Sequence, residues 1–557
     1  MWVKVLLLFF VFSFLFRTDD SFNQDLGRHL KLGEIILQTK TVPLTNLFSY
    51  TYPDFPFINT HWLFEALTYL MNQAAGLQAF LVIKVIILLI SVYLILKIVP
   101  KENSILLLPI GFIFLHVLRE RTELRPEIFS FFFTAGTYYI LEKYLRRPTK
   151  LVYLLPLIQL LWINTHIYFF VGLVLQAIFA VHLIYQHLRS HIGSGKLKIM
   201  AIIFSLSVAV SLINPYGLTT LLYPLNVTKN YGYTIAENQT MFLLESINFR
   251  DHNFLFVKIA IAIIILSLVI AFLKRKFEVK NLLMAGFGLV LALLNIRSFP
   301  YLIFLSLPAT LQTIGEVRKS SLTKILIIIF SGILLLESYF YLSGDYYRGR
   351  DEDNMVGLKL VENGKKALDF VLDKNLPNPI YNNFDIGSYI LYRGYPKYRV
   401  FVDGRPEGYP AEFFRDIYIP SQYDPQKFKE LDQKIGFKTI IFSITDQTPW
   451  GKAFLASIVK NTDWKTVYID DFLIILVKKD ILASQGQALQ MLDLSKLDPG
   501  FYPFDSYLSY LKLSLFLIQT GNQQAAQKFA RVALSIFPES PLGNALFGIE
   551  VKNKFFW

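Results

Sequence analysis

Cysteine is absent from this chain of 557 residues, and charged residues make up only 17% of it. The lack of cysteine excludes disulfide bonds, thiolate metal sites and a cysteine nucleophile. The chain also lacks a glycine-rich phosphate loop, a GxSxG nucleophile elbow and an HExxH zinc motif, which argues against a nucleotide site in a soluble domain. What it has instead is apolar sequence, since 54% of its residues are hydrophobic. This composition is typical of a polytopic helical membrane protein.

Apolar stretches recur over the first 343 residues and predict about eleven membrane-spanning helices. Basic residues gather in alternate loops, so the positive-inside rule places the amino terminus, with Lys4, in the cytoplasm. The net charge of +13 therefore arises at the ends of the spans and does not indicate a nucleic-acid partner. The predicted spans lie near residues 2–16, 79–99, 104–118, 126–145, 151–165, 167–188, 199–213, 254–273, 281–296, 299–315 and 322–343.

The same alternation places a long charged loop, residues 17–78, on the external side, with 62–78 as an interfacial helix that leads into the second span. It also places four arginines outside, against the positive-inside trend. These are Arg119, Arg121, Arg125 and Arg297. Outward arginines in short loops indicate anion binding, and contact with lipid headgroups is the alternative.

The chain divides into a transmembrane domain (1–343), a linker (344–375), an external α/β domain (376–480) and a helical tail (481–557). Candidate strands at 378–382, 399–403, 437–443, 466–470 and 472–478 are separated by helical stretches near 425–435 and 450–461. This pattern favours a mostly parallel sheet. The tail places Gly521, Ala526, Ala530, Ala533 and Pro538 at the spacing of half a tetratricopeptide repeat, which predicts a helical hairpin that caps the α/β domain.

Five segments together resemble bacterial GT-C-type membrane glycosyltransferases. They are DLGRHLKLGEIILQTKTVPLTNLFSYTYPDFPFINTHWLFEALTYL (25–70), WINTHIYFFVGL (162–173), NPYG (214–217), the turn at Arg297, and YNNFDIGSYILYRGYPKYRVFVDGRPEGY (381–409). The resemblance covers nearly the whole chain and matches a subgroup with an external α/β domain. It implies a GT-C-like membrane fold and transfer of a sugar from a polyprenyl-phosphate-type donor to an external glycan, lipid or protein.

The resemblance also implies that an acidic residue of the first external loop acts on the acceptor. Asp25 is the matching position, with Asp19 and Asp20 as alternatives. A carboxylate serves best as a base if partial burial raises its pKa toward the working pH. The competing interpretation is that Asp25 caps a helix over 26–38. His29 lies one helical turn after Asp25 on the same face and is a candidate to orient it, to bind phosphate or to join a metal site.

The four outward arginines, with Arg28 as a further candidate, are predicted to hold the donor phosphate. Asn164 and His166 end a span on the external side and are candidates for the sugar pocket, or for caps of the span. Trp62, Glu65 and Glu237 are further candidates for this pocket. Glu237 and His252 lie in the long external loop 214–253, which is a candidate lid. Related sequences carry an acidic residue just before Trp62, where this chain has Thr60-His61, so Glu65 is a candidate to compensate.

No residue pattern requires a metal, although the carboxylate-plus-histidine set is compatible with Mg²⁺ or Mn²⁺. The predicted location is the inner or plasma membrane, with the carboxyl-terminal domain outside. Two other functions remain open. A transporter or flippase for lipid-linked glycans would use charged residues inside the spans, of which Lys84 is the clearest. A non-catalytic envelope scaffold would recruit partners through its external domain.

Overall fold

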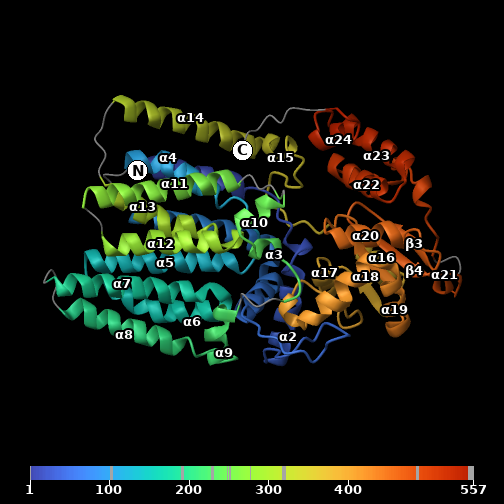
Figure 1. Cartoon of the computed structure of the whole chain (residues 1–557), viewed down its shortest axis with the longest axis horizontal. Coiled ribbons are helices and arrows are strands. Elements are labelled where there is room, and N and C mark those ends of the chain that lie inside the picture. The colour runs from blue at the N-terminus through green and yellow to red at the C-terminus, as the bar shows by residue number, and fades with distance from the viewer. Residues whose placement is uncertain are drawn as a thin grey trace.

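The chain forms a helical membrane part and a carboxyl-terminal part built around a small sheet, seen side by side in Figure 1. The structure is a computed structural model, and it describes residues 2–100, 104–189, 194–226, 231–247, 249, 253–275, 278–315, 321–484 and 489–549. The first external loop, with α2, lies between the membrane helices and the carboxyl-terminal part.

Each of the eleven predicted apolar segments coincides with a helix. Four helices are long and apolar enough to cross a membrane: Trp62–Ile98, Ile167–Leu188, Asn253–Leu273 and Thr323–Ser343. Several shorter apolar helices accompany them, so the number of crossings stays a prediction. The helices of this part are α1 (Trp2–Leu15), α2 (Leu26–Thr39), α3 (Trp62–Ile98), α4 (Ser104–His116), α5 (Glu127–Arg146), α6 (Leu155–Thr165), α7 (Phe170–Leu188), α8 (Ser194–Val210), α9 (Leu218–Leu222), α10 (Met241–Ser246), α11 (Asn253–Leu273), α12 (Val279–Leu294), α13 (Leu307–Ile314), α14 (Ser321–Ser343) and α15 (Asp345–Arg348).

Helix α3 changes direction at Gly76, where φ is 75° and ψ is 159°. Only glycine adopts this conformation at low cost, so the break separates 62–75 from the apolar 77–98. The first of these pieces packs against α2. A Cβ on Gly33 of α2 would lie 2.1 Å from the carbonyl oxygen of Glu65, so glycine is needed for this approach. The packing fixes α2, and the residues just before it, at the end of the second span.

The carboxyl-terminal part contains one four-stranded sheet in the order β1-β2-β4-β3. Only β1 and β2 are parallel, and both other pairings are antiparallel, so the prediction of a mostly parallel sheet is wrong. The elements are α16 (Lys365–Asp373), β1 (Ile380–Asn382), α17 (Gly387–Gly394), α18 (Ile419–Tyr423), α19 (Pro425–Ile435), β2 (Thr439–Ser443), α20 (Pro449–Ile458), β3 (Trp464–Ile469), β4 (Leu473–Lys478) and α21 (Lys479–Ser484). Helix α16, from the stretch expected to be a linker, packs on β3 and β4.

The fifth predicted strand, 399–403, does not join the sheet. Its Val400 forms an isolated parallel bridge with Ser49 of the first external loop, and its backbone N–H donates to Phe48 O over 3.1 Å. Nearby, Arg405 Nη2 donates to Asn46 Oδ1 over 2.7 Å. These bonds attach the α/β unit to the first external loop, because the loop supplies the partners that a neighbouring strand would otherwise provide.

The tail forms a hairpin of α22 (Tyr507–Gln519) and α23 (Gln523–Ile536), followed by α24 (Pro541–Ala545). Ala526, Ala530 and Ala533 are buried between the helices, and Ser514 Oγ donates to Ala526 O over 2.9 Å. Side chains of the hairpin share one hydrophobic core with the α/β unit. The hairpin therefore packs on this unit as expected, while its kinship with tetratricopeptide repeats stays a prediction.

Candidate functional site

A cavity of about 530 Å³ lies where the membrane part, the first external loop and the α/β unit meet. The membrane part contributes Arg125, Glu237 and Arg297, and the first external loop contributes Asp20, Gln24 and Asp25. A smaller hollow of about 130 Å³ shares Asp25, Arg125, Ile235, Arg297 and Gly404 with it. The smaller hollow also exposes Arg28, His29, His61, Glu127, His166 and Glu407. Most of the predicted site residues thus line two hollows that share part of their walls.

Asp25 lies at the boundary of the two hollows, immediately before α2. Its carboxylate accepts a bond from Arg28 Nη2 over 3.1 Å and makes no capping bond to the backbone of α2, so capping does not explain this residue. Burial alone would raise the pKa of Asp25, but the guanidiniums of Arg28 and Arg125 bring it below its usual range. The condition that burial raises the pKa is therefore not met at Asp25, and this carboxyl is ionised at neutral pH.

His29 is held by a buried carboxylate. Its Nδ1 lies 3.0 Å from Glu65 Oε1, and Asn59 Nδ2 donates to Glu65 Oε2 over 2.6 Å. Burial and the charge of Arg28 hold the pKa of His29 below its usual range. A neutral ring that donates from Nδ1 to Glu65 presents the lone pair of Nε2 to the hollow. Glu65 itself is fully buried and positions His29 rather than lining the cavity.

Three of the arginines meet on the carboxylate of Glu237. Arg121 Nη1 and Arg125 Nη1 lie 3.0 and 3.1 Å from Glu237 Oε1, and Arg297 Nη2 lies 2.8 Å from Oε2. Arg297 Nε is also 3.1 Å from Glu127 Oε1. Burial would raise the pKa of Glu237, but Arg125, Arg121 and Arg297 hold it well below its usual range. Three guanidiniums thus face two carboxylates, and Arg125 also lies in the field of Asp25 and Glu123.

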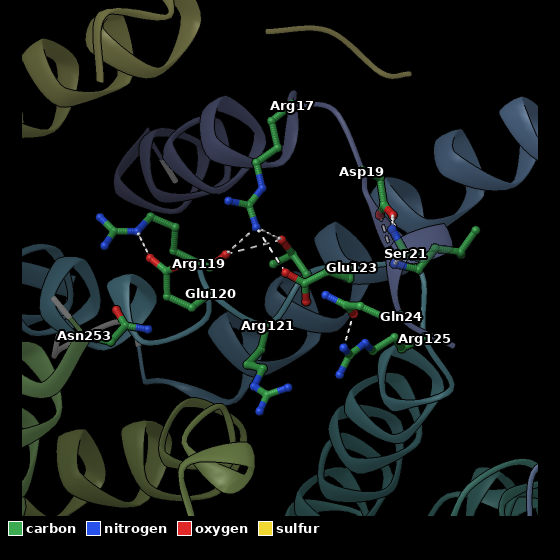
Figure 2. A network of polar contacts seen from close by, with 12 residues as sticks. Arg17, Asp19, Ser21, Gln24, Arg119, Glu120, Arg121, Glu123, Arg125 and Asn253 are labelled. Atoms are coloured by element: carbon green, nitrogen blue, oxygen red, sulfur yellow. Dashed lines mark hydrogen bonds and ion pairs between the residues drawn. The ribbon is translucent and has the colours of Figure 1, made fainter. Parts of the chain in front are cut away.

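Arg119 lies outside this cluster. Figure 2 shows it on the far side of the Arg17 network from Arg125. Its Nε lies 2.8 Å from Glu120, its Nη1 donates to Tyr341 over 2.9 Å, and its guanidinium lies over the ring of Tyr346. The structure therefore gives Arg119 a place at the junction of α4 with α14 and α15, away from both hollows.

The residues predicted for a sugar pocket are divided. Trp62 Nε1 donates to Asn164 Oδ1 over 2.8 Å, and Asn164 Nδ2 donates to Ile213 O over 3.0 Å, so this pair ties α3 and α6 to the segment that follows α8. His166, in contrast, lines the smaller hollow, and its Nδ1 is 2.7 Å from Ser130 Oγ. Burial and Arg297 keep the pKa of His166 well below its usual range. His252 lies outside the described residues.

Asp19, one of the alternative bases, is an internal partner of Lys84. Its Oδ2 lies 2.7 Å from Lys84 Nζ and accepts from the backbone N–H of Leu124 over 2.9 Å. Lys84 was the clearest charged residue predicted inside a span, and the ion pair with Asp19 explains how its charge is tolerated there. Asp19 does not line either of the two hollows that contain Asp25.

The Asp19→Ala variant is expected to lose about 3 kcal/mol of folding stability, because it leaves the buried Lys84 ammonium unpaired. Glu34→Ala, which breaks the more exposed pair with Lys31, is the matched control and should cost well under about 1 kcal/mol. Thermal unfolding of the purified protein in detergent measures both. Equal melting temperatures for the two variants would contradict the structural role of Asp19.

Sequence reasoning missed several residues that the carboxyl-terminal part brings to the two hollows: Phe384, Asp385 and Glu407 of the α/β unit, and Lys512 of the tail. Asp385 had a detectable signal, because it follows β1 by three residues and ligands commonly bind beyond the carboxyl ends of strands. The side chains of Asp403 and Arg405 instead bond each other over 2.7 Å. Of residues 403–405, only Gly404 lines the larger cavity.

Carboxylates of the kind that Mg²⁺ or Mn²⁺ prefers line the larger cavity, among them Asp20, Asp25, Glu237 and Asp385. In the part of the chain that the structure describes, no three His, Asp or Glu side chains are grouped closely enough to hold a metal ion. The donor chemistry fits and the spacing does not, so no reaction step is assigned to a metal.

Apolar helices long enough to cross a membrane, an α/β unit and a cavity between them define a helical membrane protein with a carboxyl-terminal α/β unit. The chain is similar in structure to AglB, the oligosaccharyltransferase of the archaeon Archaeoglobus fulgidus, solved with an inhibitory peptide and a dolichol-phosphate. The TM-score is 0.54 at 12% identity, over 99% of this chain and 87% of that chain. For the apo oligosaccharyltransferase of Archaeoglobus fulgidus, the TM-score is 0.52 at 12% identity, over 84% and 73%. No family model and no curated protein sequence matches the chain.

Proposed function

We propose that this protein is a membrane glycosyltransferase that moves a sugar from a polyprenyl-phosphate-type donor to an acceptor outside the membrane. One observation supports this function above the others. Asp25 and the guanidiniums of Arg125 and Arg297 line the same cavity, although they come from three separate external segments. A carboxylate beside positive groups is what transfer from a phosphate leaving group requires.

In the proposed reaction, an acceptor hydroxyl or amide attacks the anomeric carbon of the donor sugar. The bond from that carbon to the phosphate oxygen breaks, and Arg125 and Arg297 stabilise the negative charge that develops on the phosphate. Two buried donors, Arg28 Nε and Arg125 Nε, have no hydrogen-bond partner in the described structure, so the cluster has N–H groups to spare for an anion. Asp25, ionised and facing the same space, accepts a hydrogen bond from the acceptor.

The fold supports the same type of substrate. AglB was solved with a dolichol-phosphate, which is a polyprenyl-type lipid phosphate, and this chain shares its fold. We place the amino terminus in the cytoplasm and the α/β unit outside, as the positive-inside rule predicts. The acceptor belongs to one of three classes, an envelope glycan, a lipid or a protein.

The test is transfer itself. Membranes that contain the protein receive a radiolabelled polyprenyl-linked sugar, and we expect label to appear on an envelope acceptor, with none in membranes that lack the protein. A flippase would move the labelled lipid across the bilayer without transferring the sugar, and a scaffold would do neither. Either of these results would refute the glycosyltransferase function.

A further inference from the structure

The carboxylates on the wall of the larger cavity differ in their partners. Asp25 pairs with Arg28, Glu237 pairs with three arginines, and Asp353 lies 2.7 Å from Lys512 Nζ. Asp20 and Asp385 line the same wall, and among the described residues no hydrogen bond or ion pair to another residue engages either side chain. Asp20 lies in the field of Arg17 and Arg125, whereas the charges that act on Asp385 are those of Asp446 and Asp25. A carboxylate kept without a partner inside a reaction cavity is available to the substrate.

Asp385 and Asp25 both lie just before the first residue of two helices that pack together. Asp25 directly precedes α2, and Asp385 comes two residues before α17. Figure 1 shows these helices next to each other, and their approach is close, because a Cβ on Gly27 would lie 2.7 Å from Ser388 O. Gly404 completes the junction, where a Cβ would lie 3.0 Å from Asp25 Oδ1. The packing therefore brings the two carboxylates to one side of one cavity.

The backbone on the amino-terminal side of Asp385 is held firmly. Asn383 Nδ2 donates to Asp446 Oδ2 over 3.1 Å, and Asn383 Oδ1 accepts from the backbone N–H of Ser443 over 3.1 Å. The backbone N–H of Phe384 donates to the hydroxyl of Tyr418 over 2.8 Å. The backbone that carries Asp385 is therefore fixed at the cavity wall, while its carboxylate stays open to the cavity.

We propose that Asp385 is the second carboxylate of the reaction centre and takes the proton that the acceptor loses during transfer. This inference rests on the proposed function. As the acceptor oxygen or nitrogen bonds to the anomeric carbon, its proton passes to a carboxylate oxygen of Asp385, and the phosphate leaves with the electron pair of the broken bond. Asp385 then returns the proton to water. Asp25 orients the acceptor and remains ionised.

The protonation behaviour of the two carboxyls agrees with this division. Desolvation by the surrounding protein, with the charges of Asp446 and Asp25, raises the pKa of Asp385 to about 7. A base works best when its pKa is near the working pH, whereas Asp25, with its lowered pKa, is a weak base. The groups that face Asp385 are Asp446 after β2, Asp25 before α2 and Tyr233 of the long external loop. Arg125, Glu237 and Arg297 lie elsewhere on the wall.

The experiment is a pH profile of sugar transfer by the full-length protein in nanodiscs, with a polyprenyl-linked sugar as donor. In the wild type we expect the rate to rise as pH increases through about 7, because only deprotonated Asp385 accepts a proton. Asp385→Asn should transfer sugar about 10²-fold more slowly, and its rate should no longer rise with pH. Its binding of polyprenyl phosphate should equal that of the wild type. Asp385→Glu should restore part of the rate and the rise. Asp446→Asn removes a neighbouring charge and should move the rise to lower pH.

The outcomes separate the two proposals. If the wild type transfers sugar and Asp385→Asn keeps the wild-type rate and profile, the role of Asp385 is refuted and the function stands. If Asp385→Asn loses donor binding as well as transfer, the residue is structural and the role is again refuted. If the wild type transfers no sugar, the proposed function itself is refuted. Asp416→Asn, an exposed carboxylate of the same unit, is the matched control and should behave as wild type.

Discussion

Replacing Asp25 by Asn is expected to reduce the rate of sugar transfer by about 10³-fold to 10⁴-fold. The amide keeps the size of the side chain and loses the negative charge that holds the acceptor and balances Arg28 and Arg125. Asn can also offer an N–H where the acceptor needs an oxygen, so the acceptor would be turned away from the anomeric carbon. Initial rates with a saturating lipid-linked donor measure the loss as a change in kcat.

The control for Asp25→Asn is Asp54→Asn, which makes the same change in the same external loop. Asp54 is exposed and lines neither hollow, so its transfer rate should stay within about twofold of the wild type. Binding of polyprenyl phosphate should remain in both variants, because the arginines are unchanged. Full activity in Asp25→Asn would remove Asp25 from the mechanism.

A second consequence of Asp25→Asn distinguishes an electrostatic role from a structural one. The charge of Asp25 helps to raise the pKa of Asp385. Without that charge, the pKa of Asp385 should fall, and the rise in the residual rate should move to lower pH. A structural defect would lower the rate equally at every pH.

The sequence was most informative where the physical signal is local. Apolar runs with basic flanks predicted eleven segments that all fold as helices, because backbone groups within a bilayer must be satisfied inside each helix. The first external loop was located in the same way, and its packing against α3 then carries Asp25 and His29 to the end of a span. Arg119 shows the limit of such reasoning. It shares a short loop with Arg121 and Arg125, but its side chain turns toward Tyr341, and no pattern in the loop indicates that direction.

The sheet was mispredicted although a signal was present. The candidate strands 466–470 and 472–478 have a single residue between them, and such a connection requires an antiparallel hairpin, since a parallel pair needs a crossover of a dozen residues. Asp385 is a different case. Its place near Asp25 depends on α17 packing against α2, across more than 300 residues of sequence, and only the folded chain brings these segments together.

The second large effect is expected when the arginine cluster is changed, and it concerns the use of the lipid-linked donor rather than of the acceptor. In Arg125→Gln combined with Arg297→Gln, we expect kcat/KM for the lipid-linked donor to fall by about 10²-fold to 10⁴-fold. Each charged hydrogen bond to a phosphate contributes about 1.5–3 kcal/mol, and both are strongest when the leaving group gains charge. The loss should therefore appear in kcat as well as in KM, whereas lost ground-state binding would raise KM alone.

Two comparisons make the arginine result specific. Arg348→Gln removes an exposed guanidinium just beyond α14, outside both hollows, and should leave the donor kinetics unchanged. Binding of polyprenyl phosphate, which carries no sugar, should weaken in the double variant, because the cluster contacts the phosphate and not the sugar. If the double variant binds polyprenyl phosphate as the wild type does, the guanidiniums of Arg125 and Arg297 serve only to hold Glu237 and Glu127. The donor phosphate would then have to be held by Arg28 and His166, on the other side of Asp25.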